Sequence, residues 1–403
     1  MGAPAARVAE LSSHWASAGH EVTVLTGFPN HPTGVLAQEY RGKLHHLILH
    51  EEFHGVKVVR TWLLPFPNRK SIERILNYSS FCFSSALTGS FLPRPDVVIA
   101  TSPQLLAGLS GWWLSRKHSI PFIFEVRDLW PESLVAVGVG NENSLLHRLL
   151  SKLAGFLYQK SHRIVVVTPA FKTHLMQKWG VPEEKITIVE NGVETDLFQP
   201  RANDDLTAEL RRSWNAKDKF VVCYIGTMGM AHGLETLLDV ASQLQSSRPD
   251  ILFVLVGEGA EKERILTMAR GRNLGNVRFI DQQPREIIPA YINATDVCLV
   301  LLKKTDVFKT VIPTKMLEYM ACGRPVILGV DGQARTILEE AQAGIFVEPE
   351  NVDALRHAIL KLAASVPLRA ELSQNGRDYI VKNASRESTA RTYIGALETI
   401  APR

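Results

Sequence analysis

The sequence predicts an α/β protein built from two doubly wound domains. Its β-branched apolar runs are short and continuously hydrophobic, as in parallel strands that are covered on both faces. Amphipathic helical stretches alternate with these runs almost throughout the chain. The 403 residues are enough for two domains, each with its own core.

The predicted strands fall into two series that a polar stretch separates. The first series is expected at residues 21–26, 56–60, 96–100, 121–125 and 163–168. The second is expected at residues 220–225, 251–256, 277–280, 296–302, 325–328 and 344–347. The polar stretch 199–219 places the boundary near Pro200, giving domains 1–199 and 200–384, with a C-terminal helix at 385–403 completing the first domain. Ligands of such sheets bind at the carboxyl ends of the strands, here in a cleft between the domains.

The start of the chain departs from this scheme. Residues 1–11 already read as a glycine turn followed by a helix, with no strand before it. A doubly wound domain normally begins on a strand that leads into such a turn. We therefore expect either that the coding sequence upstream supplies an apolar strand or that the N-terminal sheet lacks a central strand.

Composition excludes several classes of function. A hydrophobic fraction of 45% and a charged fraction of 21% are typical of soluble globular proteins, and no apolar run is long enough to span a bilayer. The net charge of +4 is spread along the chain, which argues against a nucleic-acid binder and allows weak attraction to anionic lipid. The four distant cysteines form no CxxC pair, and no signal peptide opens the sequence. These features predict a cytoplasmic protein.

The strongest functional signal lies at residues 311–328. Thr314 is expected to cap a short helix whose N-terminus offers unpaired N–H groups to an anion, and Lys315 and Glu318 share one face of that helix. A diphosphate with an attached ribose would fit this arrangement. The alternative is a capped surface helix with an intrahelical ion pair. It is less favoured because a cap at Thr314 places Leu317, and not Glu318, at the capping-box position.

Two glycine turns follow predicted strands in the second half. The turn at 226–233 includes Gly226 and Thr227 and could bring backbone N–H groups to a phosphate, although a plain strand-to-helix turn explains it equally well. In the turn at 256–264 the sixth position of the dinucleotide fingerprint is Lys262, which argues against a dinucleotide cofactor. The chain has no Asp-x-Asp or HExxH motif, so no metal cofactor is expected.

A charged segment at 124–133 ends a strand of the first half. It places Arg127 and Asp128 beside aromatic residues, where charges are costly to desolvate unless they are paired or used. A structural Arg127–Asp128 ion pair is one interpretation. Because the segment lies at the carboxyl end of a strand, we favour a functional role.

Aromatic and basic residues also gather in two apolar helices of the first half. Trp112 and Trp113 precede the basic residues 116–118, while Phe81, Phe83 and Phe91 lie on the other helix. Such residues suit a membrane interface. Helices packed on a buried sheet explain the pattern equally well.

Taken together, these segments resemble the GT-B glycosyltransferases of family 4, and within them the bacterial WbuB-like group of surface-polysaccharide enzymes. The resemblance covers nearly the whole chain, from Gly2 to about Asn383. It is carried by residues 2–7, 19–29, 125–132, 190–193, 226–233, 256–261 and 313–323.

The resemblance implies that a sugar is transferred from a nucleotide-diphosphate donor to a lipid-linked acceptor. The donor would be UDP-linked, and the transfer would retain the anomeric configuration and need no metal. The setting would be synthesis of O-antigen, capsule or exopolysaccharide, with an N-acetylated deoxysugar such as L-FucNAc as one candidate sugar. The enzyme would work in the cytoplasm, in peripheral contact with the inner membrane face, without a cofactor and without nucleic acid.

The resemblance also assigns roles to residues. Glu318 would hold the donor ribose, while Lys315, the amides after Thr314 and the turn at Gly226 and Thr227 would hold the diphosphate. Asp128 and Arg127 would face the transferred sugar or the acceptor hydroxyl. The remaining donor contacts would come from Gly2 in the first domain and, near the base, from Gly257 and Gln283.

Two departures from the family pattern bear on these roles. The Glu-x7-Glu pair would need an acid at Thr310, and the cations of the family's glycine turn are absent from residues 227–232. Lys315, Lys309 or Arg7 must therefore supply the positive charge. Two alternatives stay open: a nucleotide-sugar epimerase of the same shape, and a catalytically silent partner that binds nucleotide sugar.

Overall fold

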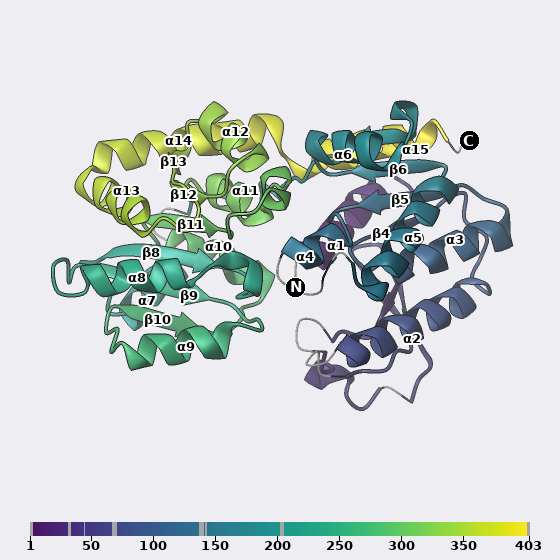
Figure 1. The fold of residues 1–403 in the computed structure, drawn as a ribbon, viewed down its shortest axis with the longest axis horizontal. Coiled ribbons are helices and arrows are strands. Elements are labelled where there is room, and N and C mark those ends of the chain that lie inside the picture. Colours follow the sequence, from purple (N-terminus) through teal and green to yellow (C-terminus); the bar gives the residue numbers. More distant parts are fainter. Residues whose placement is uncertain are drawn as a thin grey trace. The chain divides into compact units, whose positions relative to one another are not determined.

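The chain divides into two α/β units in the computed structural model, which describes residues 3–30, 34–43, 45–66, 71–136, 141, 143–201 and 205–400. Gly2–Glu190 together with Glu387–Arg403 form the N-terminal unit, and Asn191–Arg386 form the C-terminal unit (Figure 1). The polypeptide thus changes unit before Pro200, because Val193 and Phe198 are fully buried in the core of the C-terminal unit.

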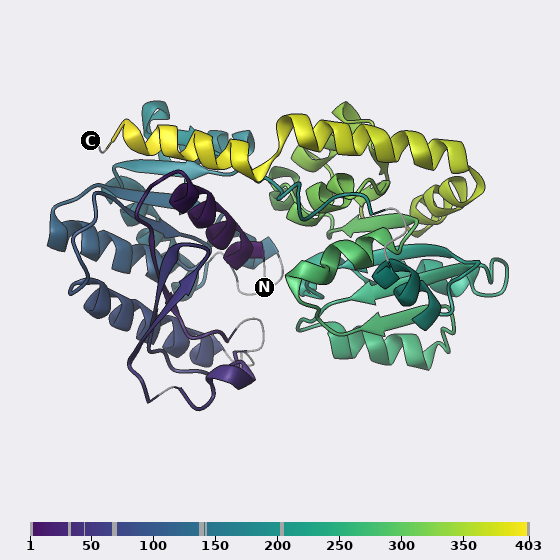
Figure 2. The ribbon, with the colours of Figure 1, turned by 180° about the vertical axis from the view of Figure 1, so that it is seen from behind.

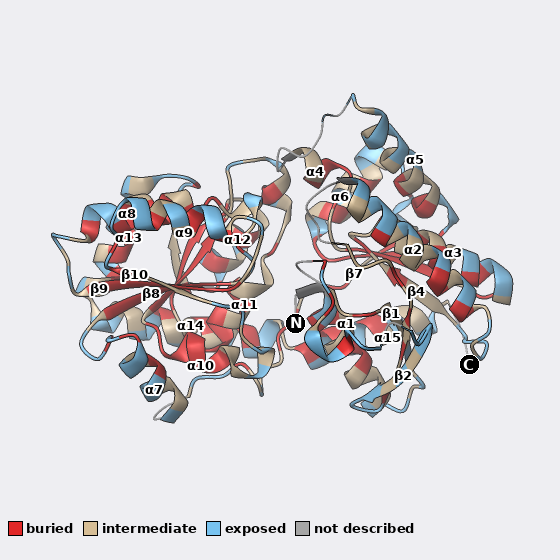
Figure 3. Ribbon diagram, turned by 90° about the horizontal axis from the view of Figure 1, so that it is seen from below, coloured by how far each residue is buried: buried red, intermediate tan, exposed pale blue. Residues whose placement is uncertain are grey.

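One parallel sheet of six strands organises the C-terminal unit, in the order β10-β9-β8-β11-β12-β13. The strands are β8 (Phe220–Ile225), β9 (Ile251–Val256), β10 (Val277–Ile280), β11 (Val297–Leu301), β12 (Val326–Gly329) and β13 (Gly344–Phe346). Every residue of β8, β9, β11 and β12 is buried, as their continuous apolar sequences predict (Figure 3). All six expected strands of this half are confirmed.

Helices cover both faces of this sheet and create two core clusters. The helices α8, α9 and α13 pack on one face, α7, α10, α11 and α12 pack on the other, and α14 contributes to both clusters. Their bounds are α7 (Asp205–Ser213), α8 (Glu235–Leu244), α9 (Lys262–Gly271), α10 (Ile288–Asn293), α11 (Thr314–Ala321), α12 (Gln333–Glu340), α13 (Val352–Ala364) and α14 (Val366–Asn383). This is the doubly wound arrangement that the sequence predicts.

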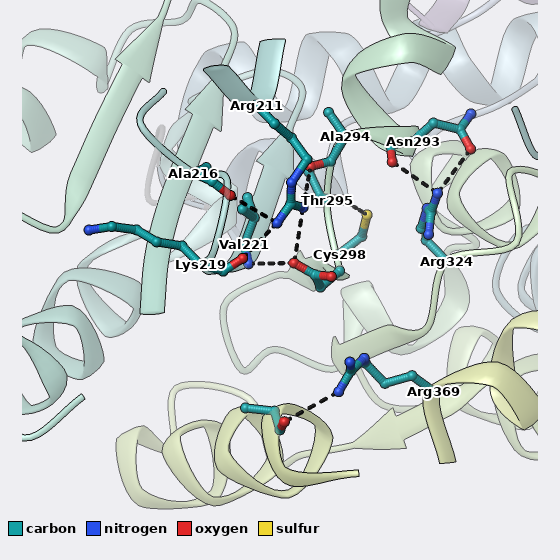
Figure 4. Close-up of polar contacts among 12 residues, drawn as sticks. Arg211, Ala216, Lys219, Val221, Asn293, Ala294, Thr295, Cys298, Arg324 and Arg369 are labelled. Carbon is teal, nitrogen blue, oxygen red and sulfur yellow. Dashed lines mark hydrogen bonds and ion pairs between the residues drawn. The ribbon is translucent and has the colours of Figure 1, made fainter. Parts of the chain in front are cut away.

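Polar contacts brace the amino-terminal ends of the strands in this unit (Figure 4). Arg211 on α7 donates to Asp296 at 3.2 Å, and the same carboxylate accepts from the Val221 N–H at 2.7 Å. Asn293 is buried and accepts from Arg324 at 3.2 Å. These contacts hold the sheet at the amino-terminal ends of its strands, opposite the carboxyl ends at which ligands of such sheets bind.

The strands of the N-terminal unit form two separate sheets. In the first, β1 (Thr23–Gly27) pairs in parallel with β3 (Val56–Thr61), which pairs antiparallel with β2 (Ile48–Phe53). The second is fully parallel and holds β4 (Val98–Thr101), β5 (Phe122–Val126), β6 (Arg163–Val166) and β7 (Ile186–Ile188). Among the described residues no strand joins β1 to β4, which is the split expected of an N-terminal sheet that lacks a central strand.

The remaining helices belong to the N-terminal unit, and the C-terminal helix α15 packs on α1 (Figure 2). Their bounds are α1 (Ala3–Ser17), α2 (Ser71–Gly89), α3 (Leu105–His118), α4 (Glu132–Ala136), α5 (Leu145–Lys160), α6 (Pro169–Trp179) and α15 (Arg386–Glu398). The Trp15 and Tyr393 rings meet edge to face at 5.1 Å, and Trp15 donates to the Ala390 carbonyl at 3.2 Å. None of the helices in the described ranges combines the length and apolar composition that crossing a bilayer requires.

Candidate functional site

The N-terminus of α11 lacks the side-chain cap that we expected. Pro313, with φ −63° and ψ 120°, occupies the N-cap position and makes no cap hydrogen bond, while Thr314 is the first residue of the helix. The prediction of Thr314 as the cap is therefore wrong by one residue. Because proline has no side-chain acceptor, Pro313 cannot cap the first turn with its side chain. The Met316 N–H donates to the Pro313 carbonyl at 3.0 Å, so the N–H groups of Thr314 and Lys315 are the ones that can face an anion, together with the positive end of the helix dipole.

Lys315 brings a buried amine to this helix end. The residue as a whole is half-buried, but its Nζ is buried and has no hydrogen-bond partner among the residues that the structure describes. Nζ lies 3.9 Å from the centre of the Tyr224 ring, in cation–π geometry. Burial lowers the pKa of Lys315 to about 7, although the negative charge of Glu318 acts in the opposite direction. An unpartnered amine in this position is a site at which an anion would be strongly favoured.

Glu318 pairs with a residue that the sequence did not single out. Arg285, from the short helix η4 (Arg285–Ile287), donates to Glu318 Oε1 at 2.8 Å, and both side chains are almost buried. The Arg285 guanidinium also lies over the Phe198 ring, 4.8 Å from its centre. The intrahelical pair of Lys315 with Glu318 is thus not formed, and Glu318 pairs with a cation from another segment instead. Arg285 fixes the orientation of this carboxylate.

The two glycine turns approach each other closely at the carboxyl ends of β8 and β9. Gly226 has φ +143° and Gly257 has φ +147°, in a region that side chains rarely adopt. A Cβ at Gly226 would lie 2.8 Å from Lys315 Nζ, and one at Gly257 would lie 2.0 Å from the Gly226 carbonyl oxygen. Only glycine permits this packing. As a result, the backbone of Gly226 lies next to the amine of Lys315.

The turn after β8 carries no positive charge of its own. It contains the short helix η3 (Met230–His232), and Tyr224 donates to the Thr227 carbonyl at 2.6 Å. Burial, reinforced by the charge of Lys315, lowers the pKa of His232 to about 3, so this imidazole is neutral at physiological pH.

Of the three cations considered for the diphosphate, two are committed elsewhere. Arg7 is buried in the N-terminal unit, where it donates to Glu125 at 3.0 Å and to two backbone carbonyls. Lys309 is half-exposed and pairs with Asp306 at 2.8 Å. Lys315 therefore remains the candidate for this role.

The region expected to contact a base lies at the ends of β9 and β10. Lys262 donates to Asp281 at 2.6 Å and also pairs with Glu258, so it joins the turn after β9 to the loop after β10. Gln283 donates to the Asp281 carbonyl at 3.1 Å. The expected donor contacts of this half thus belong to one unit and lie at the carboxyl ends of its strands. They are Gly226, Gly257, Gln283 and the N-terminus of α11.

In the N-terminal unit, Arg127 and Asp128 follow β5 directly. The Ser102 hydroxyl accepts from the N–H of Arg127 at 2.8 Å and from that of Asp128 at 3.3 Å, which fixes the loop. Ser133 donates to the Asp128 carboxylate, and burial raises the pKa of Asp128 above its usual value. The ion pair with Arg127, the structural alternative, is not among the contacts of Asp128.

The two neighbouring acids of this segment serve the fold. Burial alone would raise their pKa values, but the charge of Arg7 holds the pKa of Glu125 below its usual range. Hydrogen bonds from His174 and Lys178 likewise lower the pKa of Glu132 to about 2. Asp128 is therefore the acid of this segment that is available to take part in a reaction. Gly2, the expected donor contact from this half, lies outside the described residues.

The buried amine predicts how stability depends on pH. In the unfolded chain Lys315 keeps a pKa near its usual 10.5, whereas the folded value is about 7. Between these values the unfolded state binds more protons, so the free energy of unfolding should rise with pH. From about pH 7 to pH 9 we expect a gain on the order of 2 kcal/mol in wild type relative to Lys315→Met. Denaturant titrations of both proteins at the two pH values measure this difference. If the free energy of unfolding changes equally with pH in both proteins, the pKa of Lys315 is not lowered by burial.

Comparison with known proteins adds to this geometry. The glycosyl transferase 4-like domain family matches residues 2–192, and the family of glycosyl transferases group 1 matches residues 207–379. WcaI of Escherichia coli K12, described as a colanic acid biosynthesis glycosyl transferase, is 25% identical over 96% of this chain and 93% of its own length. WbjE of Pseudomonas aeruginosa, described as a glycosyltransferase, is 27% identical over 75% of this chain and 76% of its own.

Solved structures show the same fold. Sucrose-phosphate synthase from Thermosynechococcus elongatus superimposes with a TM-score of 0.75 at 22% identity, covering 99% of this chain and 93% of its own. HepE from Anabaena, solved with UDP and glucose, gives 0.70 at 16% identity, covering 94% and 100%. The two Rossmann-like domains have the GT-B architecture. The chain is a glycosyltransferase, in which a glycosyl transferase 4-like domain is followed by a group 1 domain.

Proposed function

We propose that this glycosyltransferase moves a sugar from a nucleotide-diphosphate donor to a lipid-linked acceptor in surface polysaccharide biosynthesis, with retention at the anomeric carbon. The observation that carries the proposal is the Lys315 Nζ at the N-terminus of α11. It is buried without a hydrogen-bond partner in the described part of the chain, and the N-cap residue Pro313 forms no side-chain cap. A diphosphate would supply the acceptors that this amine lacks and would restore its full positive charge.

The chemistry needs little covalent assistance from the protein. As the bond between the anomeric carbon and the diphosphate oxygen breaks, its electron pair passes to the leaving group, and negative charge develops beside Lys315 and the first turn of α11. The acceptor oxygen forms the new bond, and the departing phosphate takes the acceptor proton. Since these groups interact most strongly with the charge that forms in the transition state, they accelerate the reaction beyond binding the donor.

Glu318 would accept hydrogen bonds from the ribose hydroxyls of the donor, in an orientation fixed by Arg285 at 2.8 Å. Lys315 and the helix end supply the positive charge, so the proposed reaction requires no metal. We place the base near Gly257 and Gln283. Asp128 and Arg127 would act on the transferred sugar or the acceptor hydroxyl.

A UDP-linked donor is the first choice, supported by the UDP bound in HepE, and an N-acetylated deoxysugar such as L-FucNAc remains our candidate for the sugar. The relative WcaI, described as acting in colanic acid biosynthesis, supports a polysaccharide product. The WbuB-like subgroup stays a proposal.

Product analysis tests this function. The purified full chain is incubated with a panel of UDP-, GDP- and dTDP-linked sugars and a bacterial membrane lipid extract, and lipids and nucleotides are identified by mass spectrometry and nuclear magnetic resonance. We expect one donor to yield a lipid that has gained one sugar, with retained anomeric configuration and an equal amount of nucleoside diphosphate. An epimerised donor without a new lipid, or donor binding without any product, would overturn the proposal.

Asp128→Asn tests the acceptor side separately. The amide can still accept from Ser133, so the loop should keep its conformation. We expect donor affinity to stay within about twofold of wild type while transfer falls at least about a hundredfold, as for loss of a group that acts in the transition state. Initial rates at saturating donor measure this effect. Transfer at the wild-type rate would remove Asp128 from the reaction.

A further inference from the structure

Helix α2 carries its polar residues inside and its large apolar residues outside. Its buried face consists of Asn77, Ser84, Ser85 and Thr88, each 8% exposed or less. Its outer face consists of Ile72, Ile75, Leu76, Phe83 and Leu87, which are between 41% and 70% exposed. At about 100° per residue these five positions fall within roughly a third of the helix circumference, so they form one stripe along the helix, in which the exposed Ser79 stands between Leu76 and Phe83. A surface helix of a globular protein normally shows the opposite pattern.

Hydrogen bonds fix this orientation of α2. Asn77 donates to the Leu64 carbonyl at 2.6 Å, and Ser85 donates to Ser110 on α3 at 3.0 Å. The hydroxyls of Thr88 and Thr61 lie 3.0 Å apart. Rotating the helix to bury its apolar stripe would break these bonds and leave buried polar groups without partners. The outward position of the stripe is therefore built into the packing of the unit.

Two exposed aromatic residues extend the stripe. Phe91, just beyond the end of α2, is 83% exposed. Trp113 is 50% exposed and belongs to α3, the helix next to α2 (Figure 1). The Trp113 indole donates to the Ser90 hydroxyl at 3.3 Å, which places it beside the end of α2. We call the seven residues Ile72, Ile75, Leu76, Phe83, Leu87, Phe91 and Trp113 the α2 apolar face.

Positive charge accompanies this end of the face. Arg116 and Lys117 are exposed in the last turn of α3, and the exposed Arg94 donates to the Ser119 carbonyl at 3.4 Å next to them. Residues 71–119 hold four Lys or Arg and only two acids. Within the part of the chain that the structure describes, neither Arg116 nor Lys117 forms an ion pair. A tryptophan and cations beside an apolar stripe match the headgroup region of an anionic bilayer.

We propose that the α2 apolar face binds the surface of an anionic lipid bilayer, with its side chains in the boundary between headgroups and acyl chains and with Arg94, Arg116 and Lys117 on the lipid phosphates. The charges favour lipid over a second copy of the chain, because residues 71–119 of a second copy would bring twice as many cations as acids to these cations. The proposal deepens the proposed function, on which its purpose rests, since a lipid-linked acceptor lies in a membrane. Binding to vesicles requires neither donor nor turnover.

Vesicle co-sedimentation of the full chain tests this surface. We expect binding to phosphatidylcholine vesicles that contain phosphatidylglycerol, weaker binding to phosphatidylcholine alone, and a loss of affinity at high salt. Removing two inserted side chains in Phe83→Ser with Leu87→Ser should lower the affinity at least about tenfold. Arg116→Gln with Lys117→Gln should abolish the preference for the anionic vesicles.

The matched control is Val366→Ser with Val381→Ser, which changes two equally exposed apolar residues of α14 in the C-terminal unit. We expect it to bind vesicles as wild type does, and circular dichroism should show that all variants are folded. Unchanged vesicle binding by the Phe83 and Leu87 variant overturns the proposal. The proposal is also overturned if wild type forms a dimer and does not bind vesicles, and if the Phe83 and Leu87 variant is a monomer.

The outcome is separable from the proposed function. Sugar transfer to an acceptor dispersed in detergent should be the same for wild type and the Phe83 and Leu87 variant. Loss of vesicle binding with normal transfer in detergent supports the membrane surface. Absence of transfer in every protein, with vesicle binding as expected, counts against the proposed function alone.

Discussion

Replacing Lys315 with methionine should abolish sugar transfer and at the same time stabilise the free protein. Methionine fills a similar volume without a charge, so it removes the cation that we propose meets the departing diphosphate. We expect transfer at saturating donor to fall at least about a hundredfold to a thousandfold. Because the buried Nζ has no hydrogen-bond partner within the described ranges and its pKa is about 7, its removal should raise the free energy of unfolding at neutral pH by on the order of 2 to 4 kcal/mol.

Lys309→Met is the matched control for this experiment. Lys309 is also close to α11 in sequence, but its side chain is half-exposed and its contact is with Asp306. Surface ion pairs of this kind contribute little, so both transfer and stability should stay near their wild-type values. Rates at saturating donor and denaturant titrations measure the two effects. A Lys315→Met protein that transfers sugar normally would remove the amine from the reaction.

The second large effect is expected at Glu318. Glu318→Ala removes the carboxylate that we propose accepts charge-assisted hydrogen bonds from the donor ribose. This should weaken donor binding by on the order of 2 to 4 kcal/mol, or roughly 30-fold to 1000-fold. The substitution also leaves Arg285 without its carboxylate at 2.8 Å. Some loss of stability should therefore accompany the loss of affinity.

A double substitution separates these two consequences. Arg285→Gln with Glu318→Ala also removes the cation that pairs with Glu318, and it should recover stability without recovering donor affinity. Titration calorimetry and thermal denaturation of the single and double variants provide both quantities. If Glu318→Ala keeps donor affinity within about twofold of wild type, or if the double variant recovers it, then Glu318 does not bind the ribose.

The strands that are buried on both faces were predictable because their composition alone specifies them. Phe220–Ile225 and Ile251–Val256 are continuous apolar runs, and both became fully buried parallel strands. Ile48–Phe53 was missed. It carries His50, Glu51 and Glu52 in an antiparallel hairpin with mostly exposed residues, so its stability comes from pairing with β3 rather than from burial.

The site was predictable to the extent that its signals are local. The motif at 311–328 marked Lys315 and Glu318, and the glycine turns marked Gly226 and Gly257, because helix ends and positive φ angles leave traces in a short stretch of sequence. Arg285 could not be found this way, since its partner lies 33 residues further along the chain. One signal was available: Arg285 follows β10 on the edge of the sheet where ligands bind.

The orientation of helix α2, with its apolar residues outward, shows a different limit of what a sequence can predict. Its Phe81 and Phe83 suggested either a membrane interface or a packed core. Hydrophobic periodicity indicates that a helix has an apolar face, but it does not tell which face meets the sheet. That choice was made by the hydrogen bonds of Asn77 and Ser85 to neighbouring segments, which only the folded unit reveals.

Titration calorimetry with UDP, GDP and dTDP tests most directly whether Lys315 and the N-terminus of α11 hold the donor diphosphate. At about pH 8 the free amine is mostly neutral, so binding of a diphosphate should take up a proton, visible as a dependence of the measured heat on the buffer. We predict that at least one nucleoside diphosphate binds wild type and Lys309→Met equally, with proton uptake, and that Lys315→Met loses both the affinity and the uptake. Equal affinity of Lys315→Met, or equally tight binding of the nucleoside without its phosphates, would contradict this assignment.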